Sequence, residues 1–194
     1  AREPLALNLK ERRVVLDDEG APAAIVQRAQ SESQRLIEDY MIAANVAAAE
    51  ALIKAQRPCV FRVHDQPDPE KTDGLRDLAE AVGTRLARGQ VMRPHHFNAI
   101  LAHVRDSADE KMVNEAVLRS QAKAVYSIDN LGHFGLALRH YAHFTSPIRR
   151  YADLLVHRAL VDMLSPGSAP RDGLGGRQAF DLIDDCTHIS ETEG

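Results

Sequence analysis

The chain has 194 residues, of which 44% are hydrophobic and 27% are charged, and its formal net charge at pH 7 is −4. This composition is ordinary for a soluble globular protein with a sizeable core, and no apolar run approaches the roughly 20 residues of a membrane-spanning helix. The two cysteines, Cys59 and Cys186, lie too far apart for a disulfide framework, so we expect a reducing cytoplasm and two buried thiols.

The N-terminal residues predict β-structure. Leu5, Leu7 and Leu9 alternate with other residues at the period of a half-buried strand. Two further apolar runs, 14–16 and 23–26, flank the acidic segment 17–20, which ends in a glycine. This pattern predicts a β-hairpin with a glycine-assisted turn.

Residues 31–56 predict a long helix, because alanine is abundant and apolar residues recur at helical spacing. Glu38 and Asn45 are seven residues apart, which places them on one face of that helix. We expect Asn45 to have a structural role, because buried amides commonly hold neighbouring loops through their hydrogen bonds.

The middle of the chain reads as scaffold. Pro58 ends the long helix, and residues 59–63 predict a short buried strand. Asp73 is the expected cap of the next helix, and Pro94 opens another. A third helix is predicted over about 108–121, and we assign no chemistry to any of the three.

Residues 124–126 and 134–138 are predicted to be short strands joined by a turn. Gly132 and Gly135 bracket His133 and Phe134, which leaves room for a close approach to the backbone. Further on, a helix is expected to end at Ser165–Gly167 and a last one to start near Arg177.

A basic helix start is predicted within residues 141–158. Ser146 is a good N-cap, and Pro147 suits the first helical position. Arg149 and Arg150 would then lie in the first turn, where cations oppose the helix dipole. That placement is reasonable if an anion such as phosphate binds there; the alternative is that both arginines simply point into water.

The surrounding segment, residues 119–158, favours the anion. It holds six lysines and arginines but only two aspartates, although the whole chain is acidic. Four histidines and several aromatic residues are interleaved with them. Basic residues mixed with aromatic ones are typical of nucleic-acid binding, because arginine meets phosphate and rings stack on bases.

Several segments resemble the ribonuclease II/ribonuclease R family, in the order and at the spacing of that family. These segments are 36–47, 62–65, 118–120, 124–127, 130–138 and 141–158. The family consists of processive 3′→5′ exoribonucleases that use Mg²⁺ to release nucleoside 5′-monophosphates. The resemblance implies an α+β, mostly helical fold, in which short antiparallel strands pack against several helices of a partial RNB catalytic domain.

The resemblance also implies how the chain relates to a whole enzyme. Residues 1–194 would be the C-terminal portion of one RNB domain, without its upstream metal-binding half and without a downstream OB-type RNA-binding domain. The partner would be single-stranded RNA, with no membrane involved. We expect the full enzyme to be monomeric and cytoplasmic, and the isolated fragment to be inactive and to expose apolar surface through which it self-associates.

The implied catalytic residue is Arg149, which would lie closest to the scissile phosphate and neutralise the charge that develops on it. Asp153 follows Arg149 by four residues, so we expect it to orient that arginine. Arg150 would hold a backbone phosphate or an acidic loop.

The remaining RNA-binding residues are also implied by the resemblance. Thr145 and Ser146 would donate to phosphate oxygens, and Tyr151 would pack or hydrogen-bond near the site. Glu38 would contact a ribose hydroxyl.

No metal site is expected within the chain, because the family's metal-binding aspartates lie in a motif upstream of the matching segments. The acidic runs 17–19 and 184–185 read as solvated surface. His133, His140 and His143 are a weak transition-metal alternative, since their sequence spacing reveals no ligand geometry.

Two other functions stay open at this point. One is a non-catalytic module that binds single-stranded RNA. The other is a structural helical domain whose basic stretch docks an acidic partner protein.

Overall fold

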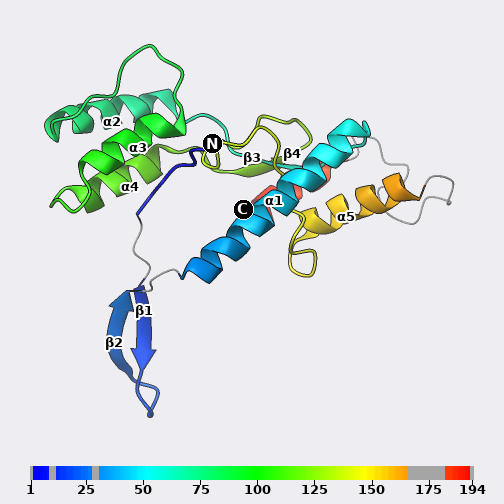
Figure 1. Cartoon of the computed structure of the whole chain (residues 1–194), viewed down its shortest axis with the longest axis horizontal. Coiled ribbons are helices and arrows are strands. Elements are labelled where there is room, and N and C mark those ends of the chain that lie inside the picture. Colours follow the sequence, from blue (N-terminus) through cyan, green and yellow to red (C-terminus); the bar gives the residue numbers. More distant parts are fainter. Residues whose placement is uncertain (1, 9–11, 28–30, 166–181, 193–194) are drawn as a thin grey trace.

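The computed structural model describes residues 2–8, 12–27, 31–165 and 182–192. Within them, the regular elements are six helices and four strands, and the strands form two separate two-stranded antiparallel sheets (Figure 1). The predicted α+β, mostly helical class is therefore confirmed. None of the helices in these ranges is both long enough and apolar enough to cross a membrane.

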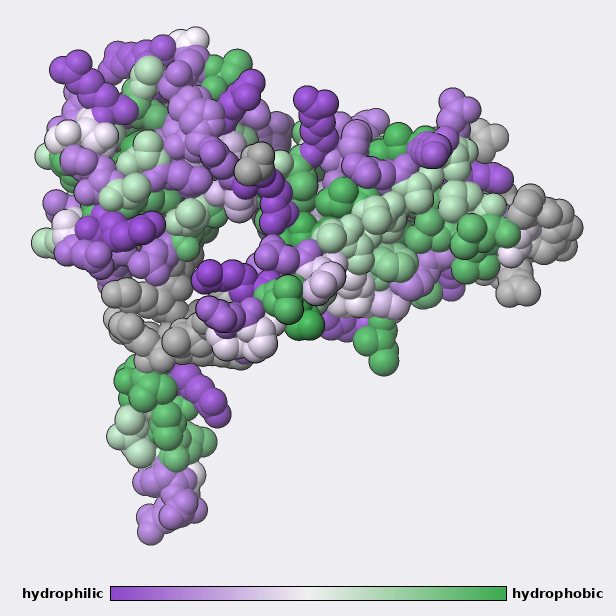
Figure 2. All heavy atoms as spheres, in the orientation of Figure 1, coloured by the Kyte–Doolittle hydropathy of each residue, from purple (hydrophilic) through white to green (hydrophobic). Residues whose placement is uncertain are grey.

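The predicted hairpin is present and extends away from the helices (Figure 1). Strand β1 (Arg12–Leu16) pairs antiparallel with β2 (Pro22–Gln27). Asp17 Oδ1 closes the turn by accepting the Glu19 and Ala21 N–H groups at 3.0 and 2.8 Å. Apolar side chains of both strands are exposed (Figure 2), so this hairpin does not share the core of the described chain.

The strand predicted at residues 5–9 is wrong, since residues 2–8 form no regular element. The Leu5 N–H donates to the Gly135 carbonyl at 2.8 Å, and the Ala6 N–H donates to Asn98 Oδ1 at 2.8 Å. Successive backbone donors therefore bond to a loop and a helix side chain instead of a partner strand. Residue 9 lies outside the described ranges.

Helix α1 (Glu32–Lys54) confirms the long predicted helix and begins with a capping box between Ser31 and Gln34. Its second half is buried through Ala48, Ala49 and Leu52. Its first half instead exposes large apolar side chains, namely Leu36, Ile37, Tyr40 and Met41.

The first core is formed by α1, β3 (Phe61–Val63), β4 (Val125–Ser127), α5 (Tyr151–Leu164) and α6 (Ile183–Thr192). Strands β3 and β4 pair antiparallel in the middle of it. Cys59 and Cys186 are free and buried there, as expected, and burial raises the pKa of Cys59 to about 12 and that of Cys186 to about 11.

The second core is formed by three short helices, α2 (Pro69–Ala81), α3 (Pro94–His103) and α4 (Glu110–Ser120). Pro94 opens α3 as predicted, and α4 lies within the predicted range. The cap of α2 was predicted wrongly. Asp68 caps it by accepting the Glu70 N–H at 2.9 Å, because Pro69 starts the helix earlier than Asp73 would.

The segment 133–138 joins the two cores and is a closed turn, so the strand predicted there is wrong. The His133 N–H donates to the Leu138 carbonyl at 2.8 Å, and the Leu138 N–H donates to the His133 carbonyl at 3.2 Å. The turn inserts Phe134 into the second core, edge-on to Phe97 with ring centroids 5.9 Å apart. Helix α5 ends before Ser165 as predicted, but the start near Arg177 lies outside the described residues.

Candidate nucleic-acid interface

The basic segment before α5 is a turn and not the first turn of the helix. The Arg149 and Arg150 N–H groups both donate to the Ser146 carbonyl, at 3.2 and 3.1 Å. Helix α5 begins at Tyr151, and its N-cap residue, Arg150, is extended (φ −128°, ψ 122°). The predicted helix start at Ser146 and Pro147 is therefore wrong by four residues.

A buried carboxylate fixes the shape of this turn. Asp153 is fully buried, and its Oδ1 accepts the Ser146 N–H at 2.7 Å. The same carboxylate binds Arg150 with two parallel bonds, Nε to Oδ2 at 2.7 Å and Nη2 to Oδ1 at 2.9 Å. Asp153 thus orients Arg150, and the expectation that it orients Arg149 is wrong.

Arg149 is the cation of the turn that has no partner in the described part of the chain. It is exposed, and its side chain makes no ion pair or hydrogen bond with any residue in the described ranges. Its neighbour Ile148 is 98% exposed, so the tip of the turn points away from the core. A guanidinium held at the tip of a fixed turn is available to an external anion.

Asn45 has the structural role that was predicted for it. It is buried on α1, and its Oδ1 accepts the N–H groups of Phe144 and Thr145 at 2.9 and 3.2 Å. Its Nδ2 donates to the Tyr141 hydroxyl at 3.1 Å. One side-chain amide of α1 therefore holds, by hydrogen bonds, the segment 141–145 that leads into the basic turn.

We expect Asn45→Ala to destabilise this segment by about 1–3 kcal/mol, because two buried N–H groups lose their acceptor. Urea unfolding and hydrogen exchange at the Phe144 and Thr145 amides would measure the loss. The matched control is Asn98→Ala, which removes an amide that binds residues 4 and 6 near the other core. Faster exchange at residues 144 and 145 in the control alone would contradict the role given to Asn45.

The side chains that flank the turn are held from both sides. His157 of α5 stacks on Phe144 with centroids 4.3 Å apart, and its Nε2 donates to the Phe144 carbonyl at 2.9 Å. His143 Nδ1 lies 2.8 Å from the Tyr126 hydroxyl, and burial lowers the pKa of His143 to about 4. Both histidines were interpreted as structural, and these contacts agree with that reading.

The predicted RNA-binding residues fall into two places. The first place is the basic turn, where Thr145, Ser146, Arg149, Arg150 and Tyr151 all lie within residues 145–151. The Thr145 hydroxyl is buried and has no hydrogen-bond partner in the described part of the chain, which is unusual for a polar group.

Glu38 lies elsewhere, on the exposed half of α1. It is seven residues, or about 10 Å along the helix axis, from Asn45. Because Asn45 binds Thr145, Glu38 shares a helix face with the residue that contacts the turn.

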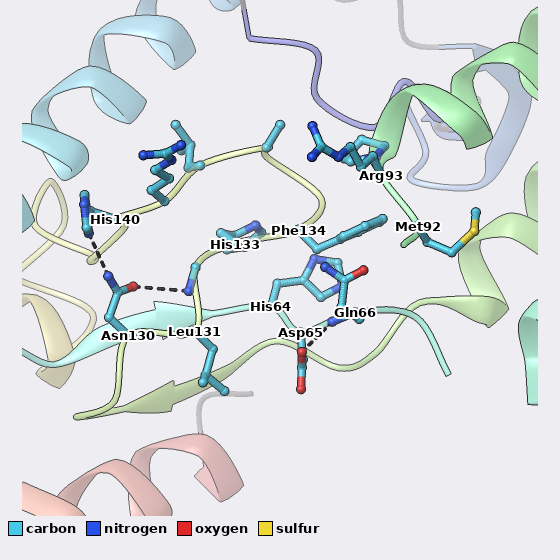
Figure 3. Close-up of a pocket in the computed structure, with 15 residues that line it drawn as sticks. His64, Asp65, Gln66, Met92, Arg93, Asn130, Leu131, His133, Phe134 and His140 are labelled. Carbon is cyan, nitrogen blue, oxygen red and sulfur yellow. Dashed lines mark hydrogen bonds between the residues drawn. The ribbon is translucent and has the colours of Figure 1, made fainter. Parts of the chain in front are cut away.

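Prediction from sequence missed an open cleft of about 530 Å³, whose lining includes His64, His133 and His140 (Figure 3). None of the six predicted site residues lines it. Gly132 and Gly135 were the sequence signal that could have indicated this cleft. The space beside Gly135 is, however, occupied by a side chain. A Cβ at Gly135 would lie 2.9 Å from His64 Nδ1, so the close approach there is that of His64.

Two of the histidines that line the cleft, His64 and His133, have lowered pKa values. Burial lowers the pKa of His133 to about 3, with further lowering by His64 and Arg62, and burial also lowers the pKa of His64. Within the described residues, no three His, Cys, Asp or Glu side chains are grouped so that they could hold a metal ion. Asp17 is engaged in its own turn, so the described residues do not fit a Mg²⁺ site.

A family model for the RNB domain matches residues 1–166 of the chain. Ribonuclease R of Aquifex aeolicus is 44% identical over 153 residues, which are 79% of this chain and 22% of that protein. Ribonuclease R of Escherichia coli is 38% identical over 164 residues, or 84% of this chain and 20% of that protein. The chain thus spans about a fifth of the length of these relatives.

Solved structures are similar as well. Mycoplasma genitalium RNase R in its apo form superposes with a TM-score of 0.85 at 27% identity, covering 98% of this chain and 30% of that one. The same protein has been solved in complex with ribose methylated single-stranded RNA and with double-stranded RNA. Yeast Ssd1, described as a pseudonuclease, shares the fold with a TM-score of 0.68 at 21% identity.

Proposed function

The chain belongs to the RNB-domain family that includes the ribonuclease R proteins, and we propose that it is the RNA-holding portion of a processive 3′→5′ exoribonuclease. Such an enzyme hydrolyses RNA to nucleoside 5′-monophosphates. The observation that carries the proposal is Arg149, an exposed guanidinium with no partner in the described residues, on a turn fixed by a buried carboxylate.

Arg149 would act on the scissile phosphate. A cation that is already held in position stabilises the charge of a phosphoryl transition state without reorganising during the reaction. The contacts of Ser146 and Arg150 with Asp153, and those of Thr145 with Asn45, restrict the turn before RNA binds. The turn therefore supplies the preorganisation that this role requires.

The neighbouring side chains would grip the RNA. Nε and Nη2 of Arg150 are used by Asp153, so Nη1 is the nitrogen we assign to a backbone phosphate. We assign the Thr145 hydroxyl, which is buried and unsatisfied, and the Ser146 hydroxyl to phosphate oxygens. Tyr151 would pack against the RNA-bound turn, and Glu38 would contact a ribose hydroxyl.

The whole enzyme would contain more than these residues. We propose that residues 1–194 are the C-terminal part of an RNB catalytic domain, and that aspartates outside them hold Mg²⁺. Support comes from the described residues, which offer no cluster for the ion, and from the relatives, of which the matched residues make up only about a fifth. The intact enzyme would act as a cytoplasmic monomer, in which the exposed apolar side chains of α1 and the hairpin are covered.

The test is degradation of a 5′-labelled single-stranded RNA by the intact protein and by the 194-residue chain, each with Mg²⁺ and with a chelator. We expect the intact protein with Mg²⁺ to shorten the label progressively from the 3′ end. The 194-residue chain should leave the RNA intact. Activity of that chain alone would contradict the assignment of the metal site, and salt-dependent binding by an inactive intact protein would favour a non-catalytic RNA-binding module.

A further inference from the structure

The cleft lined by His64, His133 and His140 combines cationic side chains with apolar ones. It is lined by segments 64–66, 92–94, 130–134 and 137–140, which come from both cores. Arg93 and Arg139 are its cationic side chains; both are exposed, and neither is paired with a carboxylate in the described residues. Figure 3 shows Arg93 at one rim and Asp65 at the opposite rim.

Backbone contacts fix the tautomers of two histidines of the cleft. Backbone N–H groups donate to Nδ1 of two rings, Gly135 to His64 at 3.0 Å and Leu136 to His133 at 3.2 Å. A ring nitrogen that accepts a bond carries no proton, so in each neutral ring the proton is on Nε2.

His140 follows the same rule through a side-chain amide (Figure 3). Asn130 Oδ1 accepts the Gly132 N–H at 3.2 Å, which identifies Nδ2 as the atom that faces His140 Nδ1 at 2.7 Å. Since an amide nitrogen only donates, His140 also keeps its proton on Nε2. His140 is only half-buried and lines the cleft, so its Nε2–H suits a ligand that accepts hydrogen bonds.

From this arrangement we propose that the cleft is a second nucleotide-binding site, in which Arg93 and Arg139 bind the phosphate and the Nε2–H of His140 donates to another oxygen of the nucleotide. Met92, Leu131 and Leu138 provide apolar surface for the base. Asp65 and Gln66 also line the cleft and would supply polar groups for ribose hydroxyls or a base amino group. A volume of about 530 Å³ is in the range that small-ligand pockets occupy.

The nucleotide has two possible sources, a released 5′-mononucleotide or a nucleotide within an RNA strand. Both present the same phosphate and base, and the choice of a nucleotide over other phosphorylated molecules rests on the proposed function. The site is separate from the basic turn, because none of the residues assigned to RNA around Arg149 lines the cleft.

The experiment measures the dissociation constants of 5′-AMP, inorganic phosphate and a ten-nucleotide oligoadenylate for the intact protein, by calorimetry with a chelator present to prevent hydrolysis. The test variant is the double substitution Arg93→Gln/Arg139→Gln. The matched control is Arg88→Gln/Arg105→Gln, which removes the same charge from two exposed arginines outside the cleft.

We expect the cleft variant to raise the dissociation constant of 5′-AMP, of the oligonucleotide, or of both at least tenfold, and the control variant to change each less than twofold. An effect on 5′-AMP alone identifies the released mononucleotide, and an effect that includes the oligonucleotide identifies the strand. Unchanged constants for both ligands would overturn the proposal. Inorganic phosphate that binds as tightly as 5′-AMP would overturn the nucleotide assignment.

The binding assay separates this proposal from the proposed exonuclease. If the cleft variant of an active enzyme binds 5′-AMP and the oligonucleotide unchanged, the proposed cleft site is overturned and the proposed exonuclease activity is not. If the intact protein binds these ligands through the cleft but never degrades RNA, the proposed exonuclease activity is overturned and the proposed cleft site is not.

Discussion

Asp153→Asn is expected to destabilise the chain by about 3 kcal/mol, because it leaves the Arg150 guanidinium without its counter-charge in a largely buried position. The Ser146 N–H would also lose an ionised acceptor, so the basic turn would loosen. The free energy of unfolding by urea and hydrogen exchange at the Ser146 amide measure these two effects separately.

A control variant and a double variant test this prediction further. Asp77→Asn removes an exposed aspartate on α2 and should change the unfolding free energy by less than about 0.5 kcal/mol. Arg150→Gln combined with Asp153→Asn should recover part of the loss, because the unpaired charge is then gone. A double variant no more stable than Asp153→Asn alone would show that the pair is not what stabilises the turn.

Arg149→Lys in the intact enzyme is expected to lower kcat about 10- to 100-fold while KM changes less than about threefold. Lysine keeps the positive charge but loses the planar fork that fits a phosphate in two places. Single-turnover rates and RNA dissociation constants, measured on the same preparation, would separate the chemical step from binding.

Arg158→Lys is the matched control, because it makes the same exchange on α5, within the same basic stretch of sequence. It should leave both constants within about twofold of the unchanged enzyme. If Arg149→Lys instead weakened RNA binding as much as it lowered the rate, Arg149 would be a ground-state binding residue and not one that stabilises the transition state.

Local sequence pattern was sufficient to predict some of the elements. The helix over 31–56, the opening of α3 at Pro94 and the hairpin all follow from periodicity, capping residues or a turn glycine. The structural role of Asn45 was also predictable in kind, because a buried amide must find partners. Its actual partners, 96 to 100 residues away, were not.

Tertiary structure decided the details of both candidate sites. Periodicity places Asp153 beside Arg149, but the chain enters α5 through a turn, and so the carboxylate meets Arg150 instead. Residues 134–138 have the composition of a strand, yet they close on themselves because Phe134 is buried between the helices of the second core. The cleft exists only because segments from the two cores meet there.

The family and the basic, aromatic-rich stretch that would contact RNA were thus predictable from the sequence alone, since both depend on residues close together in the chain. The sequence did not show which arginine is paired with a carboxylate, which is unpaired in the described residues, or where a second ligand would bind. Those properties depend on contacts between residues far apart in the chain, and packing sets such contacts after the local elements have formed.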